Sequence, residues 1–198
     1  YDTKITVSNS LDEYLIRSLL AQDAKIDSFG VGENLIVSQS SPVFGGVYKL
    51  AAITCGDKIV PKIKISENTE KITNPGYKRL YRLFDNKSNK AIADVLALYD
   101  QHLSSSQDIT IYHQEHAWKC KTISANTYSI EELQVPIFMD GKQVYEQSDV
   151  KQIREYSRQQ KERFWDEIFR LEFPHEYYVD LTKELFDLKI KMLKENRR

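Results

Sequence analysis

The chain has 198 residues, 41% hydrophobic and 29% charged, which is the composition of an ordinary soluble globular protein with one or two domains. Its 28 basic and 29 acidic residues are interspersed and leave a net charge of −1, which argues against a dedicated nucleic-acid-binding protein. No apolar run reaches the length of a membrane span, no signal peptide precedes the first predicted strand, and Cys55 and Cys120 lack a metal or redox spacing, so a cytoplasmic location is expected.

The first stretch predicts a parallel βαβ unit. Two short β-branched runs, residues 4–7 and 25–29, flank one helical pattern. The helix is expected to start at Ser10, because Ser10 and Glu13 fit the S-x-x-E capping box. Apolar residues at helical spacing predict its buried face: Leu11, Leu15, Ile16, Leu19 and Leu20.

Each predicted strand opens into a turn that is a candidate ligand loop. Residues 8–10 follow the first strand and residues 30–32 follow the second. In parallel α/β folds the turns at the carboxyl ends of strands carry the ligand site, and glycines expose backbone N–H groups to a phosphate at close range. Turn and cap chemistry alone also explains the first turn, and a tight strand-to-helix connection explains the second.

The middle of the chain predicts mainly strands. Residues 46–54 and 59–66 are expected to form an antiparallel hairpin, with Pro61 placing the second run at a sheet edge. A third strand is expected over residues 79–84, whereas residues 91–98 fit either a strand or a helix. Asp140 and Gly141 predict a second tight hairpin.

Two helices are expected at the end of the chain. The first is predicted to run from Ser148 or Asp149 to about Arg170, and the last to begin at Lys183. The long helix presents an apolar face that is expected to lie in the core: Val150, Ile153, Ser157, Phe164, Ile168 and Leu171.

Three groups of side chains can have either a structural role or a role in binding or catalysis. Alternating cations on an edge strand usually keep the edge soluble, although some of those in this chain could face an anionic substrate. His113 and His116 do not form H-E-x-x-H, and on a strand their rings would lie on opposite faces, so no metal site is expected. Trp118 and Cys120 are expected to pack along a strand through Ile123. The cations are Lys64, Lys71, Lys78, Arg79 and Arg82.

Several motifs together carry a family resemblance. Ser-Asn-Ser-Leu-Asp-Glu at residues 8–13 and Ile-Asp-Ser-Phe-Gly-Val-Gly at residues 26–32 resemble the late barrel segment of nicotinate phosphoribosyltransferases, written S-N-x-L-D-E and I-D-x-x-G-V-G-T. Order and spacing hold from end to end of the chain. The likeness continues through residues 44–50, 64–66, 71–82, 137–146 and 178–182.

The resemblance implies an α/β fold in three parts. Residues 1–42 would form the last βα units of a (β/α) barrel of the type II phosphoribosyltransferase kind, with the phosphate-binding turns. Residues 43–147 would form an appended α+β domain with a mostly antiparallel sheet, and residues 148–198 would form C-terminal helices packing on it. Because such a barrel needs roughly 250 residues, the chain is expected to be the carboxyl-terminal portion of a longer enzyme.

The resemblance also implies an activity for the whole protein in NAD biosynthesis. Nicotinate and phosphoribosyl pyrophosphate would give nicotinate mononucleotide and pyrophosphate, with ATP as co-substrate hydrolysed through a phosphorylated histidine and Mg²⁺ accompanying the pyrophosphate. It further implies a cytoplasmic homodimer with no nucleic-acid or membrane partner. None of the four histidines lies in the family's catalytic motif, so no catalytic residue is assigned and the chain alone is expected to be inactive.

The same resemblance assigns a site for the ribose 5′-phosphate. It implies contacts from Ser8 and Asn9 in one turn and from Gly30, Val31 and Gly32 in the other. The next position departs from the family, because Glu33 replaces a threonine. A carboxylate beside a phosphate is repelled unless it turns away, so only the backbone of Glu33 keeps the implied role.

Two other functions remain open on the sequence. Type II enzymes form their sites between two subunits, so the chain could serve as a non-catalytic dimerisation module. It could also belong to a related nicotinamide or quinolinate phosphoribosyltransferase, because the family's base-binding residues are not among its motifs.

Overall fold

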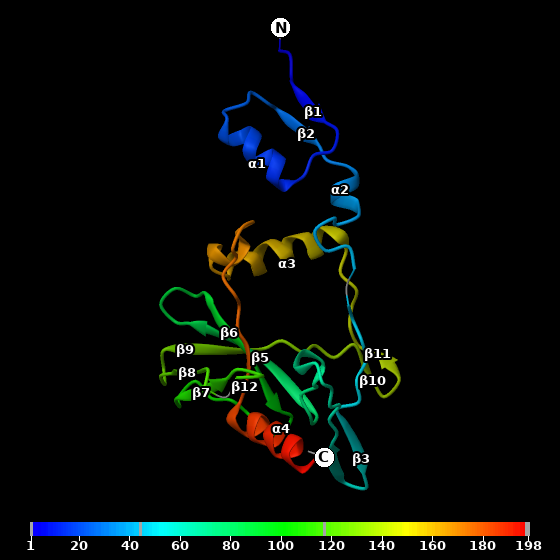
Figure 1. Ribbon diagram of the computed structural model, residues 1–198, viewed down its shortest axis with the longest axis vertical. Helices are drawn as coiled ribbons and strands as arrows, with labels where there is room; N and C mark the ends of the chain where they lie inside the picture. The colour runs from blue at the N-terminus through cyan, green and yellow to red at the C-terminus, as the bar shows by residue number, and fades with distance from the viewer. Residues whose placement is uncertain (1, 44, 117, 197–198) are drawn as a thin grey trace. The chain divides into compact units, whose positions relative to one another are not determined.

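The computed structural model describes residues 2–43, 45–116 and 118–196. The chain divides into two compact units, coloured along the chain in Figure 1. The first unit comprises Tyr1–Tyr48 with Arg170–Pro174, and the second comprises Lys49–Phe169 with His175–Arg198.

The first unit contains the predicted parallel strand pair. Strands β1 (Thr6–Ser8) and β2 (Ser28–Gly30) pair in parallel, and helix α1 (Glu13–Ala21) connects them. Both strands begin later than predicted. At that end a side-chain bond joins the backbone bonds: the N–H of Ile5 donates to the Asp27 carboxylate at 2.7 Å, and the Ile5 carbonyl accepts from the N–H groups of Asp27 at 2.9 Å and Ser28 at 3.2 Å.

Helix α1 begins later than its predicted cap. Asp12, not Ser10, is the N-cap, and its carboxylate accepts a hydrogen bond from the N–H of Leu15 at 2.7 Å. Ser10 has a left-handed backbone with φ 52°, so it lies in the turn before the helix. The capping box at Ser10 and Glu13 is therefore wrong, since aspartate is an equally good cap and the chain turns sharply before reaching it.

The predicted buried face of α1 is only partly buried in this unit. Leu11 is 3% exposed, whereas Leu15 is 42% and Leu20 is 56% exposed. The segment of the unit that follows residue 169 contacts the helix on its polar side. The Tyr14 hydroxyl donates to the carbonyl of Leu171 at 3.3 Å, and the Arg17 guanidinium pairs with the Glu172 carboxylate at 2.7 Å.

A six-stranded mixed sheet forms the second unit, in the order β8-β7-β12-β6-β5-β9. Strand β12 is parallel to β6, and the other neighbours are antiparallel. Residues 91–98, which fitted either element, form a strand, and the predicted strand at residues 79–84 is confirmed. The strands are β5 (Lys78–Asp85), β6 (Ala91–Leu98), β7 (Ile109–Tyr112), β8 (Cys120–Ile123), β9 (Tyr128–Glu132) and β12 (Val179–Leu181).

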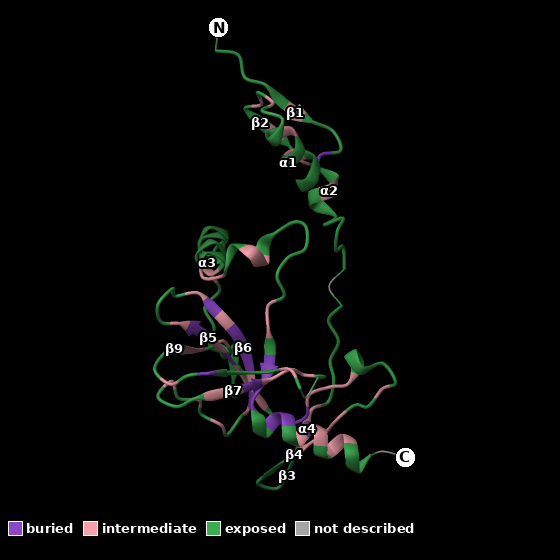
Figure 2. Cartoon of the chain, turned by 60° about the vertical axis from the view of Figure 1, so that its left-hand side comes forward, coloured by how far each residue is buried: buried purple, intermediate pink, exposed green. Residues whose placement is uncertain are grey.

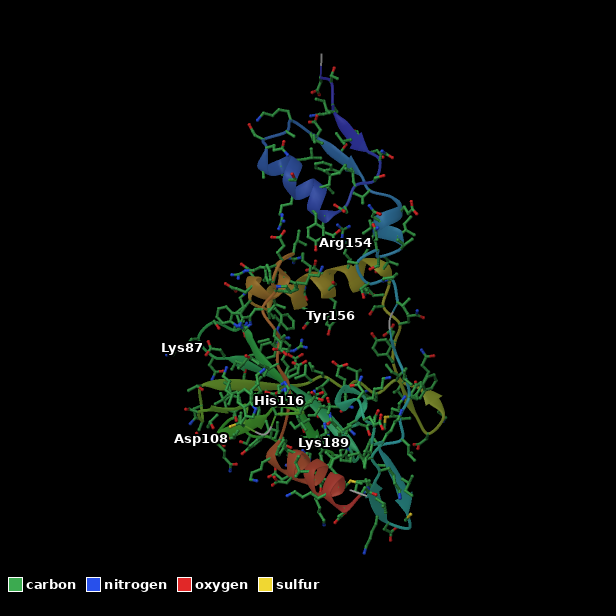
Figure 3. All side chains as sticks on the ribbon, in the orientation of Figure 1. Lys87, Asp108, His116, Arg154, Tyr156 and Lys189 are labelled. Atoms are coloured by element: carbon green, nitrogen blue, oxygen red, sulfur yellow. The ribbon has the colours of Figure 1, made fainter. Side chains whose placement is uncertain are left out.

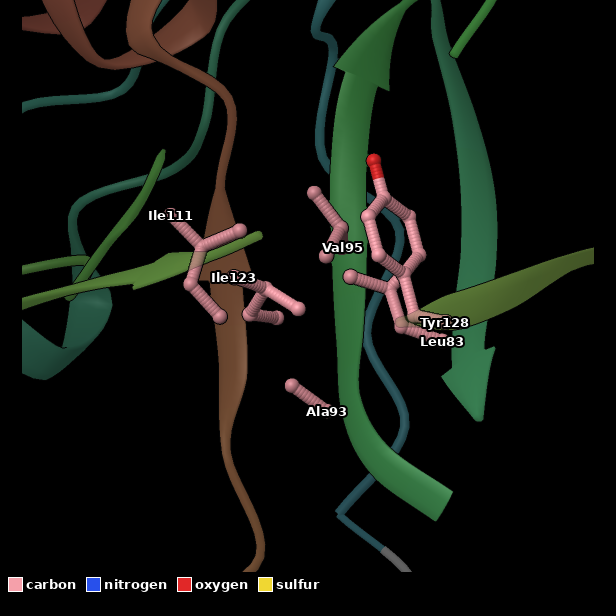
Figure 4. Close-up of a cluster of buried hydrophobic side chains, with 6 residues drawn as sticks. All are labelled: Leu83, Ala93, Val95, Ile111, Ile123 and Tyr128. Carbon is pink, nitrogen blue, oxygen red and sulfur yellow. The ribbon is translucent and has the colours of Figure 1, made fainter. Parts of the chain in front are cut away.

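The sheet curls around one apolar cluster. Five strands contribute to this cluster, including β8 and β9 at the two edges, and Figure 4 shows these side chains together. Tyr128 is 1% exposed, and its hydroxyl donates to the carbonyls of Ser104 at 3.0 Å and Gln107 at 2.9 Å, which satisfies its polar end in the core. The cluster consists of Leu83, Ala93, Val95, Ile111, Ile123 and Tyr128.

Helix α4 (Lys183–Glu195) packs on the sheet and confirms the predicted last helix. Thr182 is its N-cap, and Leu185 and Phe186 form a second buried cluster with Leu181. The Phe186 ring stacks on that of Tyr112 with centroids 5.2 Å apart. Figure 2 shows the buried residues of this unit on the sheet and on α4.

Two short hairpins form at the predicted turns, although the strands of the first are much shorter than the predicted runs of residues 46–54 and 59–66. Strands β3 (Ala52–Cys55) and β4 (Lys58–Pro61) form a separate two-stranded sheet, as do β10 (Phe138–Met139) and β11 (Lys142–Gln143). In the second hairpin Asp140 and Gly141 have φ values of 48° and 76°. Two left-handed residues define the type I′ turn that an Asp-Gly pair favours.

Helix α3 (Val150–Glu162) differs most from its prediction. It begins with a capping box formed by Asp149 and Gln152, but it ends at Glu162 rather than near Arg170, and a separate 3₁₀ turn, η2 (Asp166–Phe169), follows. Its apolar residues are not core, because Val150 is 80% and Ile153 is 54% exposed. The helix is mostly polar and has little to bury, and its end is held instead by Lys90, whose Nζ donates to the carbonyls of Glu162 and Phe164 at 2.8 and 2.9 Å.

The predicted edge cations also have another role. Strand β5 lies between β6 and β9, so Arg79 and Arg82 are not on an edge. Arg79 pairs with Glu132 at 2.7 Å, and the ammonium of Lys78 donates to the carbonyls of Asn74 and Gly76. These cations stabilise the fold of the second unit. Through residues 2–43, 45–116 and 118–196, the helices are all too short or too polar to cross a membrane.

Candidate functional site

The parallel pair brings the two predicted ligand turns side by side. Ser8 and Gly30 occupy the same position in the β1–β2 ladder, and the Ser8 hydroxyl donates to the Gly30 carbonyl at 3.2 Å. The turns after these residues therefore leave the same edge of the strand pair. The backbone alone brings Ser8 and Asn9 next to Gly30, Val31 and Gly32.

The first turn has an unusual backbone that a neighbouring side chain holds. Asn9 and Ser10 have φ values of 87° and 52°, in the left-handed region that asparagine tolerates better than most residues. The Asn34 amide donates to the carbonyls of Ser10 at 3.3 Å and Leu11 at 3.1 Å. Asn34 follows the second turn, so it ties the two turns together. The sequence contained no signal for this contact.

The two glycines of the second turn have different reasons to be glycine. A Cβ added to Gly30 would lie 3.2 Å from the Ser8 hydroxyl and 3.3 Å from its Cβ, so close strand packing favours glycine there. A Cβ added to Gly32 would meet nothing within 4 Å. The packing of the fold therefore leaves open space at Gly32, where a ligand can approach the backbone.

The dipole of helix α1 contributes little to this site. Helix α1 was expected to start at Ser10, directly after the first turn, but it begins at Glu13 behind the Asp12 cap. Two carboxylates at a helix start offset its partial positive charge. Glu33 is exposed and is the first residue of the four-residue helix α2 (Glu33–Ile36). The N-cap of this helix is Gly32, which has no side chain to accept a hydrogen bond from the first N–H groups. Backbone donors in the turns are therefore the main groups available to an anion.

An open hollow of about 500 Å³ lies in the same unit, and half-buried Val31 lines it. Val31 is the only predicted site residue among the residues that line it in the described part of the unit. The others come from the start of α1, from α2 and from the residues after it: Asp12, Glu13, Tyr14, Ile16, Asn34, Leu35, Ser38, Gln39 and Ser40.

The histidine pair does not have the predicted geometry. His113 and His116 lie in a turn after β7 rather than on a strand, and their rings stack with centroids 4.9 Å apart instead of pointing to opposite faces. Figure 3 labels His116. The Trp118 ring lies 6.0 Å from that of His116 and the residue is 80% exposed, so the expected packing of Trp118 is wrong. That the pair binds no metal stays a prediction.

One buried polar cluster was missed by sequence reasoning. Arg82 forms two hydrogen bonds to Asp94, at 2.7 and 2.8 Å, and the Tyr177 hydroxyl donates to the same carboxylate at 2.7 Å. Burial and the adjacent carboxylate raise the pKa of Tyr177. The Arg82 guanidinium also lies 4.7 Å from the Phe164 ring centroid. The cluster links β5 and β6 to the segment before β12.

The fold defines a class of protein when it is compared with solved structures. The crystal structure of human nicotinic acid phosphoribosyltransferase matches with a TM-score of 0.70 and 21% identity, over 97% of this chain and 33% of that chain. At this identity the match shows the fold, an α/β fold with a curled mixed sheet.

Sequence comparisons then give the family. The family model described as nicotinate phosphoribosyltransferase C-terminal domain matches residues 77–189. The nicotinate phosphoribosyltransferase of Bacillus subtilis is 36% identical over 98% of the chain, and that of Dictyostelium discoideum is 33% identical over 92%. The chain spans 39% and 31% of the length of these two relatives. The chain belongs to the nicotinate phosphoribosyltransferase family and corresponds to its carboxyl-terminal part.

Proposed function

We propose that this chain is the carboxyl-terminal part of an enzyme that forms nicotinate mononucleotide and pyrophosphate from nicotinate and phosphoribosyl pyrophosphate. ATP is the proposed co-substrate and Mg²⁺ the proposed companion of the pyrophosphate, with a catalytic histidine outside these residues. The described residues contain no group of three His, Cys, Asp or Glu side chains that could hold a metal ion. In this proposal the chain supplies the binding site for the ribose 5′-phosphate.

The pairing of Ser8 with Gly30 is the observation that carries this proposal. It aligns the two turns, and the open space at Gly32 lets a phosphate approach the backbone. Transfer of a phosphoribosyl group passes through a state with positive charge on the sugar, and holding the 5′-phosphate orients the anomeric carbon for attack. The proposed contacts are Ser8 and Asn9 in one turn and Gly30, Val31, Gly32 and the backbone of Glu33 in the other.

The proposed architecture of the chain has three parts. Residues 1–42 would complete the barrel, residues 43–147 would form the appended β-rich domain, and residues 148–198 the C-terminal helices. A homodimer in the cytoplasm is proposed for the whole protein. A steady-state assay of the complete protein tests the function. Turnover with nicotinate and phosphoribosyl pyrophosphate supports it, whereas turnover only with nicotinamide or quinolinate, or no turnover, would favour one of the alternatives.

The isolated 198-residue chain is expected to show no phosphoribosyl transfer. None of its histidines lies in the family's catalytic motif, and the proposed contacts bind only one end of the sugar phosphate. Purified chain would be assayed with nicotinate, phosphoribosyl pyrophosphate and ATP. Product formation above the rate of a protein-free control would show that these residues contain a complete active site.

Replacing Glu33 by threonine is expected to leave the KM for phosphoribosyl pyrophosphate unchanged or to lower it. The substitution restores the family pattern and removes an exposed carboxylate that repels a phosphate. The measurement is the KM of the complete protein at low ionic strength, where repulsion is least screened. A strong rise in KM would mean that the Glu33 side chain has a positive role in binding.

A further inference from the structure

A second hollow, of about 280 Å³, opens on the second unit, and its lining is strongly acidic. It lies where the turn after β7 meets the chain that leads into β12. Four carboxylate side chains line it, together with two tyrosines and one histidine. The lining residues are Glu70, His113, Gln114, Glu115, Glu176, Tyr177, Tyr178, Val179 and Asp180.

Asp180 is the buried member of this group, and its carboxylate accepts no hydrogen bond within the described residues. The residue is 6% exposed and, within the described residues, its side chain makes no hydrogen bond or ion pair. Among the described residues, every side-chain oxygen or nitrogen that is fully buried has a hydrogen-bond partner. The Asp180 carboxylate oxygens have none, so they are not fully buried and still reach the solvent in the hollow. Burial raises the pKa of Asp180, against the opposing effect of His113 and Lys119.

Asp94 shows how this fold treats a comparable carboxylate. Asp94 lies on the adjacent strand β6, is 7% exposed, and is satisfied by two bonds from Arg82 and one from Tyr177. The Asp180 carboxylate has no comparable hydrogen bonds, so it is available to pair with a cationic group that enters the hollow and displaces its water.

The nearby cations and donors are already engaged. Lys119 Nζ lies 3.6 Å from the Glu176 carboxylate and 5.2 Å from the centre of the Tyr178 ring. His113 Nδ1 accepts hydrogen bonds from the N–H groups of Glu115 at 3.1 Å and His116 at 3.2 Å. These side chains leave the negative charge of the hollow only partly offset.

One wall of the hollow is held rigidly. The Gln114 amide donates to the Val179 carbonyl at 2.7 Å and accepts from Asn74 at 2.9 Å. The Gln114 backbone carbonyl accepts a hydrogen bond from the Nζ of Lys189 at 3.0 Å. Lys189 is a residue of α4 and is labelled in Figure 3. A site whose walls are fixed before binding loses less free energy in ordering the ligand contacts.

We propose that this hollow binds the guanidinium group of a basic ligand, with Asp180 as its buried counter-charge and Glu176 at its rim. A guanidinium has a planar fork of N–H donors that matches a carboxylate, and it stacks on aromatic rings such as those of Tyr177 and Tyr178. This site is separate from the proposed phosphate turns. Its test measures binding, so it stands or falls independently of the proposed transferase activity.

Calorimetric titration of the complete protein with N-acetylarginine amide tests the proposal. We expect saturable binding of one molecule per chain, and no binding of the citrulline analogue, which has the same shape without the charge. Asp180→Asn keeps the size of the side chain and should weaken binding by about tenfold or more, because a desolvated charge pair loses one member. Asp57→Asn, in the exposed turn between β3 and β4, removes the same charge and should not change the affinity.

Glu176→Gln provides a second variant if Asp180→Asn lowers the melting temperature, and it should also weaken binding. A peptide containing one arginine distinguishes the source of the group: equal affinity to the amide indicates a small basic ligand, and tighter binding indicates a polypeptide. Absence of binding to the unmodified protein, equal binding of the citrulline analogue, or unchanged affinity in both Asp180→Asn and Glu176→Gln would each overturn the proposal.

Discussion

Replacing Gly32 by valine is expected to raise the KM of the complete protein for phosphoribosyl pyrophosphate by about tenfold or more, with no loss of thermal stability. The new side chain meets nothing within 4 Å at its Cβ, so the packing of the fold accommodates it. It would instead fill the space through which a phosphate reaches the backbone. Each backbone donor to a charged oxygen contributes about 1.5–3 kcal/mol, so losing one contact reduces binding by about tenfold or more.

Two neighbouring substitutions serve as controls for Gly32→Val. Ser8→Ala removes a single hydroxyl and should raise KM much less. Gly30→Ala should lower the melting temperature slightly, because its Cβ would lie 3.2 Å from the Ser8 hydroxyl and the Ser8 side chain would have to shift. If Gly32→Val left KM unchanged while Glu33→Thr abolished binding, the glycine turn would be scaffold only and Glu33 the binding residue.

Replacing Asp94 by alanine is expected to lower the free energy of unfolding by about 3–5 kcal/mol, because it leaves the buried Arg82 guanidinium without its counter-charge. The two side chains are 16% and 10% exposed, so little solvent replaces the lost pair. Denaturant titration of the complete protein, followed by a probe in the second unit, measures the loss. Tyr177→Phe keeps the ion pair and removes one hydrogen bond to a charged group, so its cost should be smaller, about 1.5–3 kcal/mol.

Comparing the loss of unfolding free energy in Asp94→Ala with that in Tyr177→Phe shows which interaction of the cluster contributes most to stability. A large loss for Asp94→Ala together with a smaller loss for Tyr177→Phe would show that the charge pair dominates. Equal small losses would mean that the Arg82 guanidinium finds other partners, and that the cluster contributes little to the stability of the sheet.

Local patterns in the sequence predicted the elements whose residues decide their own conformation. The parallel order of β1 and β2 followed from two β-branched runs around a helical pattern. The turn at Asp140 and Gly141 followed from the left-handed backbone that this pair favours. The last helix followed from the apolar spacing after Thr182.

Predictions failed where several residues could fill the same structural role, or where contacts between residues far apart in the sequence determined the local structure. Ser10 and Asp12 are both good caps, and the left-handed turn at Asn9 and Ser10 selected Asp12. Helix α3 carries an apolar pattern that is too sparse to require burial. The turn at His113 and His116 replaced the expected strand, and this reversed the predicted orientation of the rings.

Part of the candidate site could be predicted from the sequence, and part could not. The proximity of Ser8 and Gly30 could be predicted, because parallel strands place their carboxyl-end turns at one edge. The link from Asn34 to the first turn and the unpartnered carboxylate of Asp180 could not, because each depends on residues that meet only in the folded chain. The family resemblance supplied the choice of phosphate as the ligand of the turns.

A crystal structure of the complete protein with nicotinate mononucleotide bound is the most direct measurement of the central claim. The 5′-phosphate is expected to accept hydrogen bonds from backbone N–H groups of Gly30, Val31 or Gly32 on one side and from Ser8 or Asn9 on the other. A phosphate bound elsewhere, with the β1 and β2 turns free of ligand, would contradict it.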